Sequence, residues 1–264
     1  MSFLQLQGKT FLVAGVANKK SVAYYSAKTL IDEGARCVFT VQKPEQLAQV
    51  EKLFPGAPAL VCDVAQKSDI ARLPELLRPH ADRLDGLVHS IAFANFSQGP
   101  VPFHQVSRED YFEAAQISCF SFVELSNALL PLFSPGASLV TISISNTKAT
   151  SYGYLGPIKA MLDGTVPYLA KSLAAHGNIR VNAVGAGPLK TSASAGIPNY
   201  IDNYLFAEAL TLRKAALQTQ EVADAVAYLL SPRASGINAT TLIVDAGMSC
   251  NGFDQDVVQR FNRE

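Results

Sequence analysis

The residues between Gly15 and Val22 have the types and spacing that a phosphate-binding turn needs. Gly15 follows a short apolar run, and Ser21 and Val22 open a stretch with helical periodicity. A pyrophosphate requires close backbone approach, which glycine permits, and free amides at the positive end of a helix dipole. The usual three-glycine pattern is absent, so a plain turn glycine and a helix-capping serine fit the residues equally well. The spacing alone leaves both interpretations open.

Short apolar runs alternate with longer helical stretches along the whole chain. The runs are nearly continuous in Val, Ile and Leu, which is typical of strands covered on both faces. The predicted strands are Thr10–Ala14, Arg36–Val41, Ala59–Cys62, Gly86–Ser90, Ser138–Ser143, Arg180–Val184 and Thr241–Val244. The predicted helices are Ser21–Glu33, Glu45–Leu53, Asp69–Arg78, Glu109–Leu130, Ile158–Ala175 and Gln220–Leu230. This alternation predicts an α/β fold, a Rossmann-type doubly wound parallel sheet of about seven strands with helices on both faces.

No repeat, linker or low-complexity segment divides the chain, so we expect residues 1–264 to form a single dinucleotide-binding domain. The stretch at about 188–213 is the exception within it. It follows a strand, is rich in small and polar residues, and has one weak helical pattern near Tyr200–Ala209. A long excursion at the carboxyl end of a strand predicts a substrate-binding lid.

The composition excludes several classes of function. Lys+Arg and Asp+Glu both total 22, so the net charge is zero and neither nucleic acid nor an anionic membrane is an expected partner. The four cysteines lack metal-ligand or redox spacing, which predicts reduced thiols and no metal site. No signal peptide and no apolar run of roughly 18 to 20 residues are present, so we expect a cytoplasmic protein.

Five ordered blocks resemble the enoyl-acyl-carrier-protein reductase branch of the short-chain dehydrogenase/reductase superfamily. The first is Gly15 followed, after five residues, by Ser21-x-Ala23. The others continue in register over nearly the whole chain: Phe39–Gln42, Cys62–Ala65, Val88–Ala94, then Val181–Ala183 with Gly187–Thr191.

The resemblance implies a cofactor site and assigns roles within it. Gly15, Ser21 and Val22 would bind the pyrophosphate together with Thr191, and Gln42 would face the adenosine ribose. Asp63 and Val64 would hold the adenine, although helix capping is a rival role for Asp63. The remaining cofactor contacts would come from Ser90, Ile91, Ala92, Lys159 and the backbone of Leu189, which would bond the nicotinamide carboxamide. His89, in an apolar strand, is expected to be a core histidine instead.

The same resemblance implies a catalytic pair. Most of the superfamily uses Tyr-x-x-x-Lys, but Leu155 stands four residues before Lys159. Tyr152 precedes Lys159 with six residues between, which is similar to the enoyl reductase spacing. The implied chemistry is hydride delivery to Cβ of an enoyl thioester, an enolate held by the Tyr152 hydroxyl, and protonation at Cα. A loop tyrosine and a solvated helix lysine are the alternative.

The chain departs from the family pattern in four places. Ile144 replaces a further active-site tyrosine, and the stretch from there to Tyr152 is about two residues shorter. Ala92 stands where a glycine is common. The lid lacks the usual basic residues from Ile197 to Asn203, leaving Arg213 and Lys214 as partial substitutes.

We therefore expect an enoyl-thioester reductase of fatty-acid synthesis, with the substrate on acyl carrier protein or CoA and contacted by Ala94, Tyr152 and Tyr154. The alternatives are another short-chain reductase acting on an enoyl-CoA, enone or carbonyl, and a catalytically weak NAD-binding paralogue. Gln42 suits a ribose hydroxyl, which favours NADH, while Lys43 leaves NADPH open. Family members are commonly homotetramers, so we expect one here.

Overall fold

The sheet of the computed structural model, which describes residues 2–99, 101–191 and 200–261, has seven parallel strands in the order β3-β2-β1-β4-β5-β6-β7. This arrangement confirms the predicted Rossmann-type fold. The order reverses between β1 and β4, and ligands of such sheets bind outside the carboxyl ends of the strands at this reversal. The strands are β1 (Thr10–Ala14), β2 (Arg36–Val41), β3 (Ala59–Val61), β4 (Leu84–His89), β5 (Phe133–Ile144), β6 (Arg180–Ala186) and β7 (Thr241–Val244).

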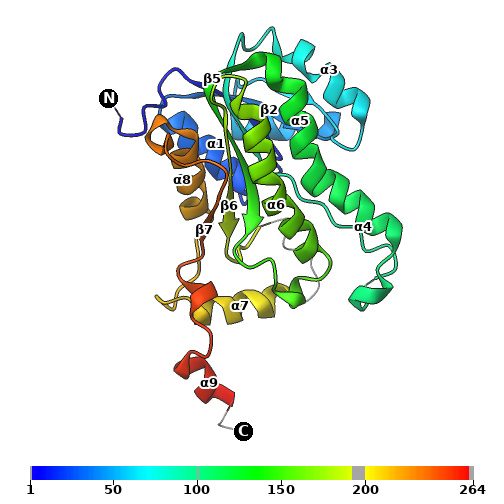
Figure 1. Cartoon of the computed structure of the whole chain (residues 1–264), viewed down its shortest axis with the longest axis vertical. Coiled ribbons are helices and arrows are strands. Elements are labelled where there is room, and N and C mark those ends of the chain that lie inside the picture. The colour runs from blue at the N-terminus through cyan, green and yellow to red at the C-terminus, as the bar shows by residue number, and fades with distance from the viewer. Residues whose placement is uncertain (1, 100, 192–199, 262–264) are drawn as a thin grey trace.

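Helices cover both faces of the sheet (Figure 1). One face carries α1 (Val22–Asp32), α2 (Leu47–Leu53) and α8 (Thr219–Leu230). The other carries α3 (Lys67–Leu77), α4 (Arg108–Ala115), α5 (Ser121–Leu129) and α6 (Leu155–Ala174). Two helices, α7 (Tyr200–Leu210) and α9 (Gln255–Phe261), lie beyond the carboxyl edge of the strands (Figure 1). Within the described residues, no helix is both long and apolar enough to cross a membrane.

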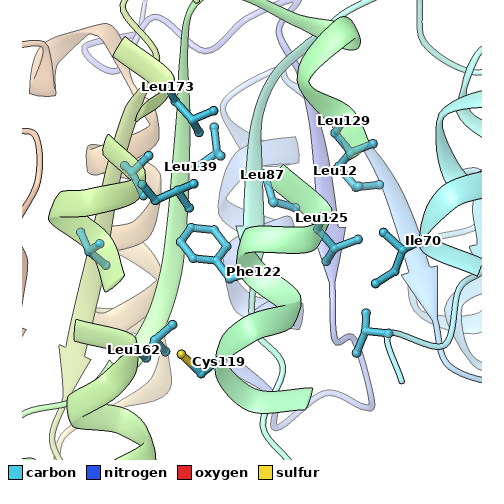
Figure 2. Close-up of a cluster of buried hydrophobic side chains, with 14 of the residues drawn as sticks. Leu12, Ile70, Leu87, Cys119, Phe122, Leu125, Leu129, Leu139, Leu162 and Leu173 are labelled. Carbon is cyan, nitrogen blue, oxygen red and sulfur yellow. The ribbon is translucent and has the colours of Figure 1, made fainter. Parts of the chain in front are cut away.

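Alternate residues of the central strands supply two separate cores. Leu12, Leu87 and Leu139 point toward α3, α5 and α6, where Phe122 and Leu125 meet them (Figure 2). Their neighbours along each strand point to the α1 and α8 side, as the two-residue period of a strand requires. Each fully buried leucine stabilises the fold by about 2 kcal/mol. These cores fix the positions of the strand ends that form the site.

The predicted strands β1, β2 and β7 are confirmed to the residue; β3, β4 and β6 differ from prediction by one or two residues at an end, and larger differences lie elsewhere. Strand β5 begins five residues early, at Phe133, because the turn-like Pro135 and Gly136 fall where its register with β4 shifts. The single helix predicted over 109–130 is divided by a π-helical turn, Gln116–Phe120. Helix α9 was not predicted. The helical pattern near Tyr200–Ala209 is confirmed as α7, while residues 192–199 of the expected lid lie outside the described residues.

Candidate active site

The turn after β1 brings two predicted cofactor residues together. Gly15 has a φ of +99°, and a Cβ built on it would lie 2.1 Å from the Ser90 carbonyl oxygen. The Ser90 amide donates to the Ala14 carbonyl at 3.0 Å, which holds the ends of β1 and β4 in contact. Any other residue at position 15 would force these ends apart. Glycine is required here by conformation and by space.

Ser21 is the N-cap of α1. Its hydroxyl accepts a hydrogen bond from the Tyr24 amide at 3.1 Å and donates to the Asn18 carbonyl at 2.8 Å. The Ser21 amide also donates to the Asn18 carbonyl, at 3.1 Å. The helix-capping interpretation is therefore confirmed, and the residue shapes the turn. The amides that remain for an anion at this helix N-terminus are those of Val22 and Ala23.

Gln42 and Asp63 meet at the carboxyl ends of β2 and β3. The Gln42 amide nitrogen lies 3.4 Å from one Asp63 carboxylate oxygen, to which it donates, and the other oxygen accepts from the Ala65 amide at 3.0 Å. The N-cap position of α3 is Gln66, whose side chain makes no capping hydrogen bond, so the rival capping role of Asp63 is wrong: its side chain accepts from Ala65 in the preceding turn. Val64 is buried in the core beside them.

Lys159 is buried on the inner face of α6 and is not a solvated helix residue. Its ammonium donates to the Ile142 carbonyl of β5 at 2.7 Å. Burial lowers the pKa of Lys159 to about 8, and the negative charge of Asp163, one helical turn later, opposes this shift. Asp163 accepts a hydrogen bond from the Thr241 hydroxyl at 3.1 Å. Lys159 is thus held at the end of β5 with a charge that is sensitive to pH.

The two tyrosines before α6 occupy different environments. Tyr152 ends a 3₁₀ turn, and burial, together with the nearby Tyr200 phenol, raises the pKa of its hydroxyl to about 12. The Tyr154 ring is buried between Phe96 and Tyr111, and its hydroxyl donates to the Asn95 carbonyl at 2.5 Å. Tyr152 therefore keeps its proton at neutral pH, while Tyr154 fixes the segment that follows β4.

Leu189 is contacted by a residue that the sequence did not single out. The Tyr200 hydroxyl, at the start of α7, accepts from the Leu189 amide and donates to the Leu189 carbonyl, both at 2.9 Å. These are the backbone groups that the resemblance assigns to the nicotinamide carboxamide. A phenol can both donate and accept, which are the two functions through which a carboxamide would bind this backbone. The only sequence signal for Tyr200 was its place in the expected lid.

A buried polar network supports the segment from Ser90 to Ala94. Ser118, in the π-helical turn, accepts from the Phe93 amide at 2.8 Å and donates to the Phe93 carbonyl at 2.9 Å. This clamp was also missed, because a π-turn has no clear sequence pattern, although such turns are frequent at functional sites. Ile91 is half-buried and Ala92 is exposed on the segment that it holds.

His89 is a core histidine, as expected. Its Nδ1 lies 2.8 Å from the Thr141 hydroxyl and its Nε2 lies 2.9 Å from the Ser121 hydroxyl. Ser121 donates its own proton to the Ile117 carbonyl, so Nε2 must carry the ring proton and Nδ1 must accept from Thr141. Burial lowers the pKa of His89 to about 3, which keeps the ring neutral.

Comparison with known proteins gives a consistent result. The family model described as "Enoyl-(Acyl carrier protein) reductase" matches residues 15–249. An NADH-dependent enoyl-[acyl-carrier-protein] reductase of Enterococcus faecalis is 36% identical over 92% of this chain and 98% of its own length. An NADPH-dependent one of Staphylococcus aureus is 33% identical over 92% of this chain and 98% of its own. The crystal structure of the NADH enzyme of Aquifex aeolicus superposes with a TM-score of 0.89 at 33% identity, covering 94% of this chain and 98% of that one.

The depressed pKa of Lys159 predicts pH-dependent binding of a reduced dinucleotide. The ammonium is charged below a pH of about 8 and neutral above it, so affinity for the anionic ligand should fall as the pH rises through this value. Tyr152 titrates only near 12 and cannot produce this transition. The measurement is the dissociation constant of the reduced dinucleotide, followed by its fluorescence, at pH values on both sides of the pKa of Lys159. Lys159→Gln should abolish the pH dependence, and a constant affinity in the unchanged protein would contradict the prediction.

Proposed function

This chain belongs to the enoyl-[acyl-carrier-protein] reductase family, and on that basis we propose how its own residues reduce the α,β double bond of an enoyl thioester with NAD(P)H in fatty-acid synthesis. The observation that carries the proposal is the position of Lys159, buried against the Ile142 carbonyl at the end of β5, with Tyr152 just before its helix. Both lie at the carboxyl edge, where this sheet places its ligand.

The strand ends fit a dinucleotide. Gly15 allows the backbone to come close, and the amides of Val22 and Ala23 face the position of a pyrophosphate at the start of α1. Gln42 and Asp63 would hold the adenosine end. Ile91 and the Leu189 backbone would hold the nicotinamide end, with the carboxamide taking the place of the Tyr200 hydroxyl on Leu189. When bound, the reduced nicotinamide supplies the hydride.

Tyr152 would act on the substrate oxygen. Its hydroxyl stays protonated, so it donates a hydrogen bond to the thioester oxygen as negative charge develops there. Lys159 would bind the nicotinamide ribose and favour that charge through its ammonium. The oxygen of an enoyl thioester lies two carbons from the atom that receives hydride. The donor must therefore stand farther from the nicotinamide than in a ketone reductase, which fits the wider spacing between Tyr152 and Lys159.

We further propose that residues 1–264 form one domain, acting in the cytoplasm, with residues 188–213 as its lid. One sheet draws strands from both ends of the chain, and all four cysteines are free. Helix α7 is the helix of this lid among the described residues, and Tyr200 ties it to Leu189.

Exposed apolar side chains support a homotetramer. Phe112 is 65% exposed on α4, Phe120 54% on the adjoining π-turn, and Tyr168 81% on the neighbouring α6. A monomer seldom leaves several large apolar groups exposed on adjacent elements. We propose that this surface packs against a second copy of the chain.

The solution mass tests this assembly. Light scattering should give four chains for the unchanged protein and a smaller species for Phe120→Asp with Tyr168→Asp, since burying two carboxylates in the interface is unfavourable. Phe253→Asp is the control, because Phe253 lies outside this surface and is 91% exposed. A tetramer that survives the double substitution would place the interface elsewhere.

The reaction is tested by oxidation of NADH and NADPH with enoyl thioesters beside a panel of ketones. We expect turnover of the thioesters, a fall in kcat of about a hundredfold for Tyr152→Phe, and nearly unchanged cofactor affinity, because the lost hydroxyl acts on the substrate. Tyr154→Phe is the matched control and should lower stability by about 1 kcal/mol with little change in kcat. Turnover of ketones alone, or an inactive Tyr154→Phe beside an active Tyr152→Phe, would contradict the assignment.

The carrier protein should add little electrostatic steering in this enzyme. Helix α7 holds Asp202 and Glu208 but no basic residue. Arg213 is paired with Glu221 at 2.5 Å and Lys214 is paired with Asp254, so neither cation is left for an acidic carrier. Ile201 and Leu205 make the exposed surface of α7 partly apolar.

We therefore expect kcat/KM for a carrier-bound enoyl chain to depend only weakly on salt and to exceed the value for the CoA form by a small factor. Steering acts mainly on association and is screened by salt. The measurement compares both substrates from low to moderate ionic strength. A steep fall confined to the carrier-bound form, and unaffected by Arg213→Ala with Lys214→Ala, would reveal a basic docking surface elsewhere.

A further inference from the structure

A cavity of about 650 Å³ lies between the turn after β1 and helix α2. Three lysines line it: Lys19 and Lys20 come from the turn, and Lys52 comes from α2. Gln49 and Thr191 add an amide and a hydroxyl, and the described lining residues include no carboxylate. The cavity is therefore positively charged and lined by hydrogen-bond donors, although the chain as a whole is neutral.

Among the described residues, the three lysines have no ion-pair partner, whereas Lys9 and Lys28 elsewhere are paired with aspartates. Three uncompensated ammonium groups around one hollow raise the local concentration of anions. A group with two negative charges fits such a site better than one with a single charge, and a phosphate monoester has this charge at neutral pH.

The position of the cavity indicates which phosphate group of a bound dinucleotide it would receive. Thr191 places one side of the cavity beside the proposed pyrophosphate site, and α2 follows β2 after a short 3₁₀ turn, Pro44–Gln46. In Rossmann-type sheets the adenosine ribose lies at the end of the second strand, where an acidic residue selects a free 2′-hydroxyl. This chain has Gln42 there, and its amide is directed to Asp63. The end of β2 itself carries no acid, and the neighbouring carboxylate, Asp63 after β3, accepts hydrogen bonds from Gln42 and from the Ala65 amide.

We propose that the lysine cavity (Lys19, Lys20 and Lys52) receives the 2′-phosphate of NADPH and makes this enzyme prefer NADPH. The inference rests on the proposed cofactor position and reverses the sequence-based expectation of NADH. That expectation rested on Gln42, and the only basic residue that it weighed was Lys43, the residue after Gln42. The fold instead assembles the basic group from two segments more than thirty residues apart in sequence. Lysines serve here as point charges, which suffices for a phosphate that needs no bidentate partner.

The test measures binding without enoyl substrate, so its outcome is independent of the reductase activity. Adenosine 2′,5′-bisphosphate and 5′-AMP differ only in the 2′-phosphate, and calorimetry gives both dissociation constants. We expect the bisphosphate to bind at least about tenfold more tightly, since charge-assisted contacts are worth this much or more. The ratio of the two dissociation constants, that of 5′-AMP over that of the bisphosphate, should fall as salt increases. NADPH and NADH should show the same preference.

Substitution of Lys52 assigns the effect to the cavity. Lys52→Gln should reduce the ratio about threefold to tenfold, and adding Lys20→Gln should reduce it further. Lys171→Gln, at an exposed lysine of α6, is the matched control and should leave the ratio unchanged. Equal binding of the two nucleotides would overturn the proposal. If Lys52→Gln weakened the binding of both nucleotides equally, the cavity would belong to the pyrophosphate and the proposal would fail. It would also fail if Lys43→Gln alone abolished the preference for the bisphosphate.

Discussion

The contact between the ends of β1 and β4 is the constraint on which the site depends. Gly15 and Ser90 approach so closely there that a single Cβ would overlap the Ser90 carbonyl. This contact joins the two halves of the sheet at the reversal of strand order. It sets where α1 begins and where the segment from Ile91 to Ala94 leaves β4. The Ser118 hydroxyl then fixes that segment from the opposite layer, so both sides of the crevice at the carboxyl edge are set by contacts to backbone groups.

Burial around this crevice controls protonation in opposite directions. It raises the pKa of Tyr152 and lowers the pKa of Lys159. It also lowers the pKa of His89, so that this ring is neutral at neutral pH. The phenol therefore remains a donor, and the lysine is the one of these three groups that titrates near neutral pH. A bound dinucleotide would favour the charged form of Lys159, because its phosphates are anionic. Cofactor and catalytic charge would then be coupled: the lysine is most fully charged when the cofactor is present.

The sequence predicted what depends on local pattern and missed what depends on tertiary contact. Strands such as Thr10–Ala14 were recognised because both of their faces are buried, and Ser21 because a capping serine has a local signature. The π-turn at Ser118 was missed since its hydrogen bonds to Phe93 join segments 25 residues apart. Tyr200 was missed for the same reason. Its hydroxyl bonds the backbone amide and carbonyl of Leu189, and a backbone contact does not depend on the type of the partner residue. The assembly of the lysine cavity likewise follows from the placement of α2 beside the first turn.

The placement of these residues gives the two ends of the crevice opposite charge. The lysine cavity makes the proposed adenosine end positive, while Asp202 and Glu208 make helix α7 acidic beyond the carboxyl edge of the strands. The net charge of zero conceals this separation, because charges more than about 10 Å apart act independently in physiological salt. A phosphorylated cofactor is then drawn to one end only. An acidic carrier gains nothing at the other, so the apolar surface of α7 and the thioester itself must provide the contacts that select the substrate. Specificity for cofactor would be electrostatic in this enzyme, and specificity for substrate would come mainly from shape and apolar contact.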